Sequence, residues 1–464
     1  MLFSMGLGSR ISKWIENNLL EKFVWLEFSL SIIASNVTII VYVFFALYDN
    51  TTFIIYALSV TIGLLIGMEI PLVVRLNERF QHLKVNISSA LENDYFGSLV
   101  GGVFFAFLGL PYLGLTYTPL ILGAVNFSVA LSLVYVIWNE LDRKVKRRLI
   151  AYSSLVLLLL ASSGIFAKRI VEWGDRIRYK DPIVYSEQSR YQKIVLTYAG
   201  GDYWLFLNGH QQLSTFDEAL YHEPLVHPLV QLHPDPKSVL ILGGGDGAAA
   251  RELLKYEGIK AITLVDLDPS VTNLARSHPV LININQDALN DERVAVINED
   301  GFSFLEKIRG QFDLIIADFP DPRTVDLGRL YSKEFYWLCR KALKEDGMMI
   351  TQAGSPYYAR EAFTCIDQTM ASAGFHTLPI HNHVLTLGEW GWVIGSKTQR
   401  NLKEELKGAS IDDIETQWLT NEAFTGLVSF GKKVFNTSET TVEINQIHSP
   451  VLYKYYLKGR WDLY

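Results

Sequence analysis

The sequence predicts a membrane α-helical bundle followed by an α/β domain, a doubly wound sheet of the Rossmann type that is preceded by a small β domain. Three observations support this prediction: long apolar stretches before about residue 170, alternating strand and helix patterns after residue 236, and a glycine-rich turn behind the first of those strands. We expect a multi-pass transmembrane domain over residues 1–175, a β-hairpin domain over 176–235, an α/β catalytic domain over 236–400 and a closing segment over 401–464.

Composition supports a membrane protein and argues against a nucleic-acid partner. The 464 residues are 49% hydrophobic with a mean hydropathy of +0.16, which is high for a wholly soluble chain. The formal net charge is −7, and no basic stripe with interleaved aromatic residues is present. The two cysteines, Cys339 and Cys365, have neither the spacing of a metal site nor that of a disulfide framework, so we expect no metal.

Five apolar stretches predict helices that cross a lipid bilayer at the cell membrane. Most reach the roughly 20 residues that a crossing needs, and together they are too many and too long for a signal peptide. Two acids at stretch edges, Glu69 and Asp94, are either interfacial groups or part of a cation site. Residues 1–8 resemble the end of a further span, so we expect a truncated start. The stretches are residues 23–47, 53–74, 96–113, 120–138 and 149–167.

The remaining chain first shows β-hairpin signals and then an α/β alternation. Strands are expected over 183–185, 193–198 and 203–207, with a tight turn at 200–202 between the last two. Residues 238–242 form a continuous apolar run, as in a strand that is buried on both faces. The later helices and strands, which together predict a doubly wound sheet, are 248–256, 261–265, 294–297, 302–308, 312–317, 333–343, 348–351 and 359–373.

The turn at residues 243–247 predicts a nucleotide site. Its glycines, Gly243 and Gly245 among them, let the backbone approach a ligand closely. Asp266 ends the second strand of the sheet, where a carboxylate can accept hydrogen bonds from ribose hydroxyls. A dinucleotide site has the same pattern, but Asp246 in the turn would repel a pyrophosphate and attract a cationic sulfonium. We therefore favour an S-adenosyl ligand over NAD.

Further acids follow the third and fourth strands. Asp300 and Gly301 stand where such a pair commonly meets an adenine amino group. Asp318 ends an apolar strand, and Asp321 follows that strand in the chain. Both therefore lie at the edge of the sheet where ligands bind in open α/β folds. Together with Asp246 they suit a polycationic amine, whose ammonium must lose a proton before it attacks carbon. Asp318 is the candidate base and Asp321 the candidate amine anchor, unless both only cap the next element.

Several motifs in order resemble the spermidine synthase family of aminopropyltransferases, over residues 180–397. The resemblance implies transfer of an aminopropyl group from decarboxylated S-adenosylmethionine, as co-substrate, to putrescine or a related amine, with no prosthetic group. Residues 67–71, 94–97 and 110–115 resemble the multi-pass bacterial subgroup. The motifs are residues 189–192, 207–209, 217–218, 221–223, 243–247, 300–301, 317–322 and 331–347.

The resemblance also implies roles for single residues. Those that would hold the nucleotide are Gln192, Asp266, Asp300 and Gly301, and those that would hold the amine and aminopropyl groups are Tyr221, His222, Asp246 and Asp321. Asp318 would accept the proton, while His222 has an alternative as a packed histidine at the end of a hairpin. The chain departs from the family at Phe319 and Pro320, at Asp266, where Glu is more usual, and near 385–388, so the acceptor amine stays open.

Two other functions and several arrangements remain open. An S-adenosylmethionine-dependent methyltransferase has the same fold, although methyl acceptors need no acid triplet, and a polyamine-binding or transport protein would need no turnover. We also expect a homo-oligomer. Basic residues 142–148 should face the cytoplasm, which would place the enzyme domain outside if 149–167 crosses fully. Because the nucleotide is made in the cytoplasm, we expect the enzyme domain to lie there. In that case, either residues 149–167 are re-entrant or lie along the membrane interface, or the basic loop is an exception to the charge rule.

Overall fold

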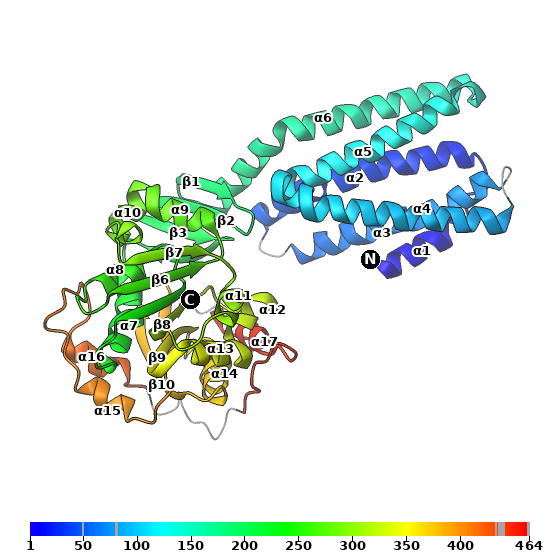
Figure 1. Cartoon of the computed structure of the whole chain (residues 1–464). Helices are drawn as coiled ribbons and strands as arrows, with labels where there is room; N and C mark the ends of the chain where they lie inside the picture. The colour runs from blue at the N-terminus through cyan, green and yellow to red at the C-terminus, as the bar shows by residue number, and fades with distance from the viewer. Residues whose placement is uncertain (49–50, 79–81, 432–433, 435–440, 462–464) are drawn as a thin grey trace. The chain divides into compact units, whose positions relative to one another are not determined.

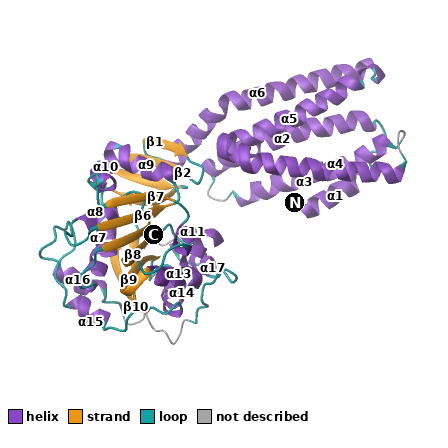
Figure 2. Cartoon of the chain, in the orientation of Figure 1, coloured by secondary structure: helices purple, strands orange, loops and turns teal. Residues whose placement is uncertain are grey.

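The chain forms two compact units, Met1–Ile183 and Val184–Tyr464. The structure, a computed structural model, describes residues 1–48, 51–78, 82–431, 434 and 441–461 (Figure 1). Figure 2 shows that the first unit is built of helices, whereas the second combines helices with strands.

The first unit packs its helices through small residues. Helix α1 lies against α3, and α2 lies against α3, α5 and α6. A Cβ atom added to Gly8 would lie 2.1 Å from the backbone oxygen of Leu64, and one added to Gly67 would lie 2.1 Å from that of Met5. Glycine thus permits the close backbone approach of α1 and α3, as is common in membrane helix pairs. The helices are α1 Leu2–Ser12, α2 Leu19–Leu47, α3 Thr52–Asn77, α4 Leu83–Phe104, α5 Gly114–Val136 and α6 Arg143–Tyr179.

Four helical segments of the described chain are long and apolar enough to cross a membrane: α2, α3, the segment Leu83–Val136 and α6. The third contains the predicted stretch 96–113 and residues 120–136 of the stretch 120–138, because a π-helical segment, Phe105–Leu113, joins α4 to α5. At Gly114 the backbone leaves the helical region, with φ 66° and ψ −175°. The predicted stretch 149–167 lies within α6, whose 37 residues form one continuous helix about 55 Å long (Figure 1). A re-entrant course would need a break in this helix, so that alternative is wrong.

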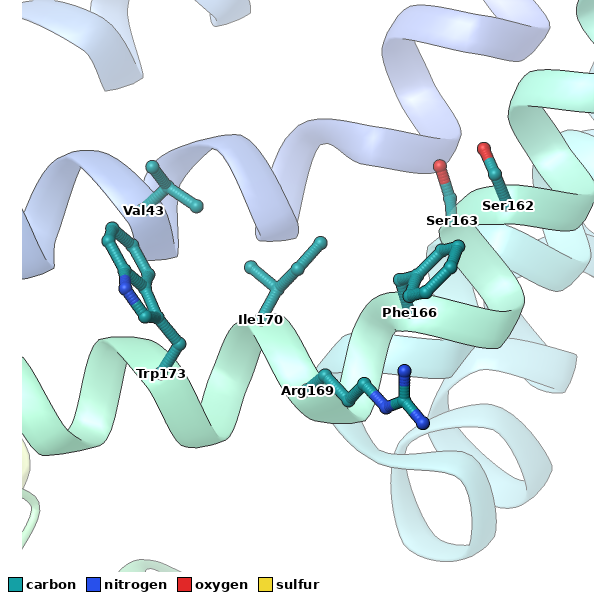
Figure 3. A pocket seen from close by; sticks show the side chains of 7 residues that line it. All are labelled: Val43, Ser162, Ser163, Phe166, Arg169, Ile170 and Trp173. Atoms are coloured by element: carbon teal, nitrogen blue, oxygen red, sulfur yellow. The ribbon is translucent and has the colours of Figure 1, made fainter.

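An open cavity of about 490 Å³ lies between α2 and α6 (Figure 3). Val43 lines it from α2, and Phe166, Arg169 and Trp173 line it from α6. Its surface is mostly apolar.

A four-stranded antiparallel sheet opens the second unit. The predicted turn is present at Gly200 and Gly201, whose φ values of 65° and 104° suit a two-residue hairpin. A second hairpin turns at Asn208 and Gly209, with φ values of 51° and 79°, and adds a strand that the sequence analysis did not predict. The strands are β1 Ile183–Gln188, β2 Lys193–Ala199, β3 Asp202–Leu207 and β4 His210–Ser214.

A seven-stranded sheet of order β10-β11-β9-β8-β5-β6-β7 forms the larger part of this unit. The predicted doubly wound order is present from β7 to β9, where all neighbours are parallel. The sheet is nevertheless mixed, because β11 runs antiparallel to β9 and β10 as the second arm of a hairpin. The strands are β5 Ser238–Gly243, β6 Ala261–Asp266, β7 Val294–Asn298, β8 Phe312–Asp318, β9 Leu343–Gly354, β10 His376–Val384 and β11 Gly388–Ser396.

Hydrophobic cores lie on both faces of this sheet. In β5, Val239 and Ile241 belong to one buried cluster, and Leu240 and Leu242 belong to the other, as the alternation of side chains along a strand requires. Side chains of α7–α10 fill the first cluster, and those of α11, α13, α14 and α17 fill the second. The helices are α7 Ala219–Leu232, α8 Ala248–Leu254, α9 Pro269–Ser277, α10 Pro279–Asn285, α11 Gly301–Glu306, α12 Val325–Gly328, α13 Lys333–Ala342 and α14 Arg360–Ser372.

Two segments differ from the predicted division of the chain. The small sheet ends at Ser214, and α7, within the predicted β-hairpin range 176–235, packs on the large sheet instead. The closing segment contributes three short helices, α15 Leu402–Lys407, α16 Asn421–Leu427 and α17 Leu452–Leu457, of which α17 packs on α14 and α12. The predicted boundaries at 175, 235 and 400 stay predictions.

Candidate functional site

The glycine turn lies between the carboxyl ends of β8 and β6. Gly243, Gly244 and Gly247 have φ values of 79°, 61° and 85°, which favour glycine. A Cβ atom on Gly243 would lie 2.1 Å from the backbone oxygen of Asp318, and one on Gly245 would lie 2.7 Å from Oδ2 of Asp266. Side chains at these positions would therefore displace both acids, and the two predicted glycines are needed to form the site.

Asp266 is fixed at the end of β6 by the turn that follows it. Its Oδ1 accepts a hydrogen bond of 2.8 Å from the backbone N–H of Asp268. Burial, with the neighbouring carboxylates Asp268 and Asp246, raises the pKa of Asp266 to about 6 despite the backbone hydrogen bonds that oppose the shift. Such a carboxylate is mostly ionised at neutral pH, and its ionised form would be stabilised by hydroxyl donors of a bound ribose.

Asp268 is a site residue that the sequence analysis missed. Its Oδ1 caps α9 by accepting from the N–H of Ser270 at 3.0 Å, and its Oδ2 accepts from Ser189 Oγ at 2.6 Å and from Gln192 Nε2 at 3.1 Å. Asp268 thereby ties the β1–β2 loop, with the predicted Gln192, to the turn behind Asp266. The Asp-Pro pair at a helix start is a capping signal and was available in the sequence.

Asp300 and Gly301 stand at the start of α11. Asp300 accepts a hydrogen bond of 3.1 Å from the N–H of Ser303 and pairs with Arg329. A Cβ atom on Gly301 would come no closer than 3.8 Å to any other residue, at Leu242, so the protein itself does not require glycine there. The predicted adenine contact of this pair stays a prediction.

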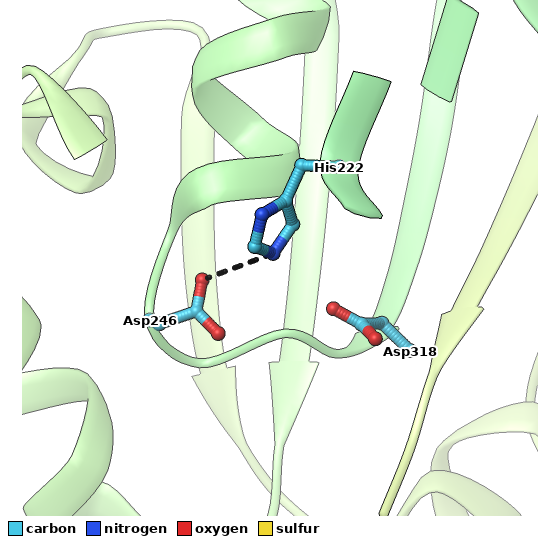
Figure 4. A group of neighbouring side chains, drawn as sticks. All are labelled: His222, Asp246 and Asp318. Atoms are coloured by element: carbon cyan, nitrogen blue, oxygen red, sulfur yellow. Dashed lines mark ion pairs between the residues drawn. The ribbon is translucent and has the colours of Figure 1, made fainter. Parts of the chain in front are cut away.

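Four predicted residues converge where α7 begins beside β5 and β8. The Tyr221 hydroxyl donates a hydrogen bond of 2.7 Å to Oδ1 of Asp318, and His222 Nε2 lies 4.0 Å from Oδ1 of Asp246. Figure 4 shows His222, Asp246 and Asp318 pointing toward one another. One nitrogen or oxygen atom of each of these three residues lies within 4.8 Å of the other two. His222 lies in a helix rather than at a hairpin end, and its side chain is buried, so the alternative of a packed histidine stays untested.

Buried charges behind this group set the protonation of His222. Its Nδ1 lies 2.9 Å from Glu218 Oε2, and Arg251 contacts the same carboxylate at 2.8 and 3.0 Å. Burial lowers the pKa of His222, but the hydrogen bond and the charge of Glu218 outweigh it and raise the pKa to about 9. The imidazole is therefore mostly protonated at neutral pH, and its Nε2 can donate a hydrogen bond. The expected absence of a metal stays a prediction.

Asp318 has the properties of a general base. Burial and the Asp246 carboxylate raise its pKa to about 6, against the opposing effects of His222 and of the Tyr221 hydrogen bond. Its Oδ2 makes no hydrogen bond within the described chain and faces the glycine turn, where a Cβ on Gly244 would lie 3.4 Å away. A carboxylate with this pKa is ionised at neutral pH and is more basic than an exposed aspartate.

Asp321 follows in a loop whose backbone is held from two sides. Gln352 Nε2 donates to the carbonyl of Phe319 at 2.9 Å, and the Tyr331 hydroxyl donates to that of Pro320 at 3.0 Å. The Asp321 carboxylate accepts at Oδ2 from Tyr456 and from Arg323. Tyr456 belongs to the closing segment, to which the sequence analysis assigned no chemistry.

Comparison with known proteins identifies the family. Residues 218–407 match the model of the spermine/spermidine synthase domain. The polyamine aminopropyltransferase of Leptospira interrogans is 36% identical over 98% of this chain and 89% of its own length. Polyamine aminopropyltransferase 2 of Aquifex aeolicus is 42% identical over 98% of this chain and 90% of its own length.

A solved structure agrees with these relatives. The crystal structure of a spermidine synthase in complex with the transition state analogue AdoDATO has a TM-score of 0.50 and 29% identity, over 55% of this chain and 87% of that one. The resemblance to the spermidine synthase family is thereby confirmed, together with the Rossmann-like fold of the second unit, whereas the resemblance to the multi-pass subgroup stays a prediction. With relatives this similar over nearly its whole length, the chain belongs to the polyamine aminopropyltransferases, the spermine/spermidine synthase family.

Proposed function

We propose that the second unit transfers an aminopropyl group from decarboxylated S-adenosylmethionine to putrescine or a related amine, with Asp318 as the proton acceptor. The products are spermidine, or its analogue, and methylthioadenosine. The observation that carries the assignment of the base is Asp318 itself, a half-buried carboxylate beside the glycine turn, one oxygen of which makes no hydrogen bond within the described chain. Family membership supports the reaction and the absence of a prosthetic group.

The reaction needs a neutral amine beside an electrophilic carbon. An ammonium with a pKa near 10 is almost fully protonated at neutral pH, so Oδ2 of Asp318 first takes one proton from it. The nitrogen lone pair then forms a bond to the aminopropyl carbon that is attached to sulfur. That carbon–sulfur bond breaks, and its electron pair converts the sulfonium into the neutral thioether of methylthioadenosine.

The remaining predicted residues divide between the two substrates. The glycine turn, Gln192, Asp266, and the pair Asp300 and Gly301 would hold the nucleoside. Asp246 would face the cationic sulfonium and the aminopropyl ammonium. His222, whose Nε2 lies 4.0 Å from Oδ1 of Asp246, would orient this carboxylate. Tyr221 and Asp321 would contact the acceptor amine.

Product analysis tests the proposal directly. Purified protein incubated with decarboxylated S-adenosylmethionine and putrescine should release spermidine and methylthioadenosine in equal amounts, as identified by mass. A methyltransferase would instead methylate an acceptor when it is given S-adenosylmethionine, and a transport or sensor protein would bind the amine without turnover. Either result would contradict the proposed reaction.

Replacing Asp266 with Ala should weaken methylthioadenosine binding at least several-fold. A carboxylate that accepts hydrogen bonds from ribose hydroxyls contributes about 1.5–3 kcal/mol per charged hydrogen bond, and Ala provides no acceptor. Calorimetric titration of the variant and the wild type measures the change. Glu299→Ala, which removes a partly exposed acid outside the predicted site, serves as the control. Unchanged affinity in Asp266→Ala would exclude the ribose contact, and NAD binding by the wild type would exclude an S-adenosyl site.

We further propose that the first unit crosses the cell membrane and that the enzyme unit lies in the cytoplasm, where its nucleotide substrate is made. Charge bias does not decide the orientation of α6, because residues 143–148 and residues 168–180 each contain five Lys and Arg. Substrate supply is therefore the stronger argument. The homo-oligomer expected from the sequence stays a prediction.

Cysteine labelling should place the two ends of α6 on opposite sides of the membrane. Asn139 and Ser277 are both exposed and lie before and after α6 in the chain, and the native Cys339 and Cys365 are buried. In intact cells, a membrane-impermeant thiol reagent should modify Asn139→Cys and should reach Ser277→Cys only after the membrane is permeabilised. Labelling of Ser277→Cys in intact cells would show that the enzyme unit lies outside.

A further inference from the structure

The closing segment brings a tyrosine hydroxyl to the predicted amine anchor. Tyr456 lies in α17 and donates a hydrogen bond of 2.6 Å to Oδ2 of Asp321, 135 positions away in the sequence. Its side chain is only 2% exposed, and its ring packs on that of Trp461, with 4.6 Å between the ring centroids. The hydroxyl is therefore held in place by packing as well as by its hydrogen bond.

The position of α17 is itself fixed from the catalytic part of the fold. Asn445 Oδ1 accepts hydrogen bonds from the N–H groups of Val451 and Leu452, at 3.2 and 3.3 Å. Its Nδ2 donates at 2.8 Å to the carbonyl of Gly328, which belongs to α12 behind the Asp321 loop. Asn445 is 1% exposed, so these contacts anchor the start of α17 in a dry environment.

The two oxygens of the Asp321 carboxylate have different surroundings. Oδ2 accepts from Tyr456 and, at 3.1 Å, from Arg323. Oδ1 is buried and has no hydrogen-bond partner within the described chain. Buried carboxylate oxygens are almost always hydrogen-bonded, because leaving one without a donor costs free energy. A donor from a bound molecule would satisfy Oδ1, and an ammonium is the donor that suits a carboxylate best.

We propose that Tyr456 is a positioning residue for the acceptor amine: by holding Oδ2 it fixes the Asp321 carboxylate so that Oδ1 receives the ammonium at the far end of the diamine. This inference rests on the proposed function and extends it to the closing segment. Without the tyrosine hydroxyl, Arg323 would be the remaining partner of Oδ2. Because its side chain is 36% exposed, it would restrict the carboxylate less.

The protonation of Tyr456 agrees with this role. Burial and the Asp321 carboxylate raise the pKa of the phenol well above its usual range. The hydroxyl therefore stays a donor at every pH at which the reaction runs, and it does not compete with Asp318 for the proton of the amine.

A conservative pair of variants tests the inference. Tyr456→Phe removes the hydroxyl and keeps the ring that packs on Trp461. Tyr455→Phe is the matched control, because Tyr455 lies in the same helix and, among the described residues, its hydroxyl accepts only a backbone hydrogen bond, at 3.2 Å from the N–H of Glu443. In the full-length protein, Tyr456→Phe should raise the KM for putrescine about tenfold and change kcat less than about threefold. Methylthioadenosine affinity should stay as in the wild type, Tm should fall by no more than the loss of one buried hydrogen bond explains, and Tyr455→Phe should leave the KM unchanged.

The possible outcomes separate this inference from the function on which it rests. An unchanged KM in Tyr456→Phe, or equal KM increases in both variants, would overturn the positioning role. Asp321→Asn provides the third measurement: if it raises the KM for putrescine while Tyr456→Phe does not, the anchor is supported and only the role of Tyr456 fails. If Asp321→Asn also leaves the KM unchanged, Asp321 is not the anchor and both assignments are wrong. Loss of methylthioadenosine binding in Tyr456→Phe would indicate a structural role and would likewise overturn the inference.

Discussion

Replacing Asp318 with Asn is expected to lower kcat at least about 100-fold, since a general base contributes about 10²–10⁴-fold to a rate. Asn has nearly the same shape and can still accept the hydrogen bond of Tyr221, but its amide cannot take a proton from the amine. Methylthioadenosine should bind with wild-type affinity, because the nucleoside contacts lie on other residues. Turnover and equilibrium binding of the purified variant measure the two effects separately.

The pH dependence of kcat/KM provides a second measurement of the same group. The ionised form of Asp318 is the active form, and its pKa is raised to about 6. On the acidic side of the profile, kcat/KM should therefore reach its full value above about pH 7 and should fall about tenfold per pH unit below pH 6. Asp318→Asn should lose this acidic limb along with most of its rate. A near-wild-type rate, or an unchanged acidic limb in the variant, would show that another group accepts the proton.

Replacing Arg251 with Met is expected to destabilise the second unit by about 3–5 kcal/mol, since removing one partner of a buried ion pair leaves an uncompensated charge. The Arg251 side chain is 3% exposed and binds two carboxylates, Glu218 at 2.8 Å and Glu252 at 2.7 Å. Met fills similar space but provides no donor. Glu218, whose pKa is lowered to about 2 by His222 and Arg251 despite its burial, would lose its strongest partner.

Thermal and denaturant unfolding of the full-length protein measure this loss. Arg400→Met is the matched control, because the Arg400–Glu405 pair is partly exposed and such surface pairs contribute about 0–1 kcal/mol. Equal stability of Arg251→Met and Arg400→Met would contradict the assigned importance of the buried network. Activity of the surviving folded fraction should also fall, because His222 depends on Glu218 for its protonation.

The sequence was sufficient to predict the centre of the site for a simple topological reason. The carboxyl ends of parallel strands meet at one edge of a sheet, so Asp246, Asp266 and Asp318 had to come together once β5, β6 and β8 were identified as neighbours. The structure places them at that edge, and Tyr221 joins them from α7. Their individual roles remain predictions that the variants above test.

The parts of the site that could not be predicted from the sequence depend on contacts between segments that are distant in the chain. Nothing near Glu218 in the sequence indicates Arg251, 33 positions later, and Tyr456 is farther still from Asp321. No strand was predicted after residue 373, so the hairpin of β10 and β11 was missed, and Pro379 within β10 obscures the strand pattern there. By contrast, the Asn208-Gly209 turn and the Asp268 cap had local signals and could have been predicted.

The buried charges behind His222 constrain how this enzyme can evolve or be redesigned. A single exchange at Glu218 or Arg251 leaves the charge of the other residue without this partner in the interior, whereas a paired exchange to apolar residues removes both of these charges. The effects of exchanges at Glu218 and Arg251 on the free energy of unfolding should therefore not be additive. A double-mutant cycle should show a coupling energy that neither single variant reveals. Libraries that vary His222 to change substrate preference will recover active sequences mainly when Glu218 and Arg251 are varied in the same step.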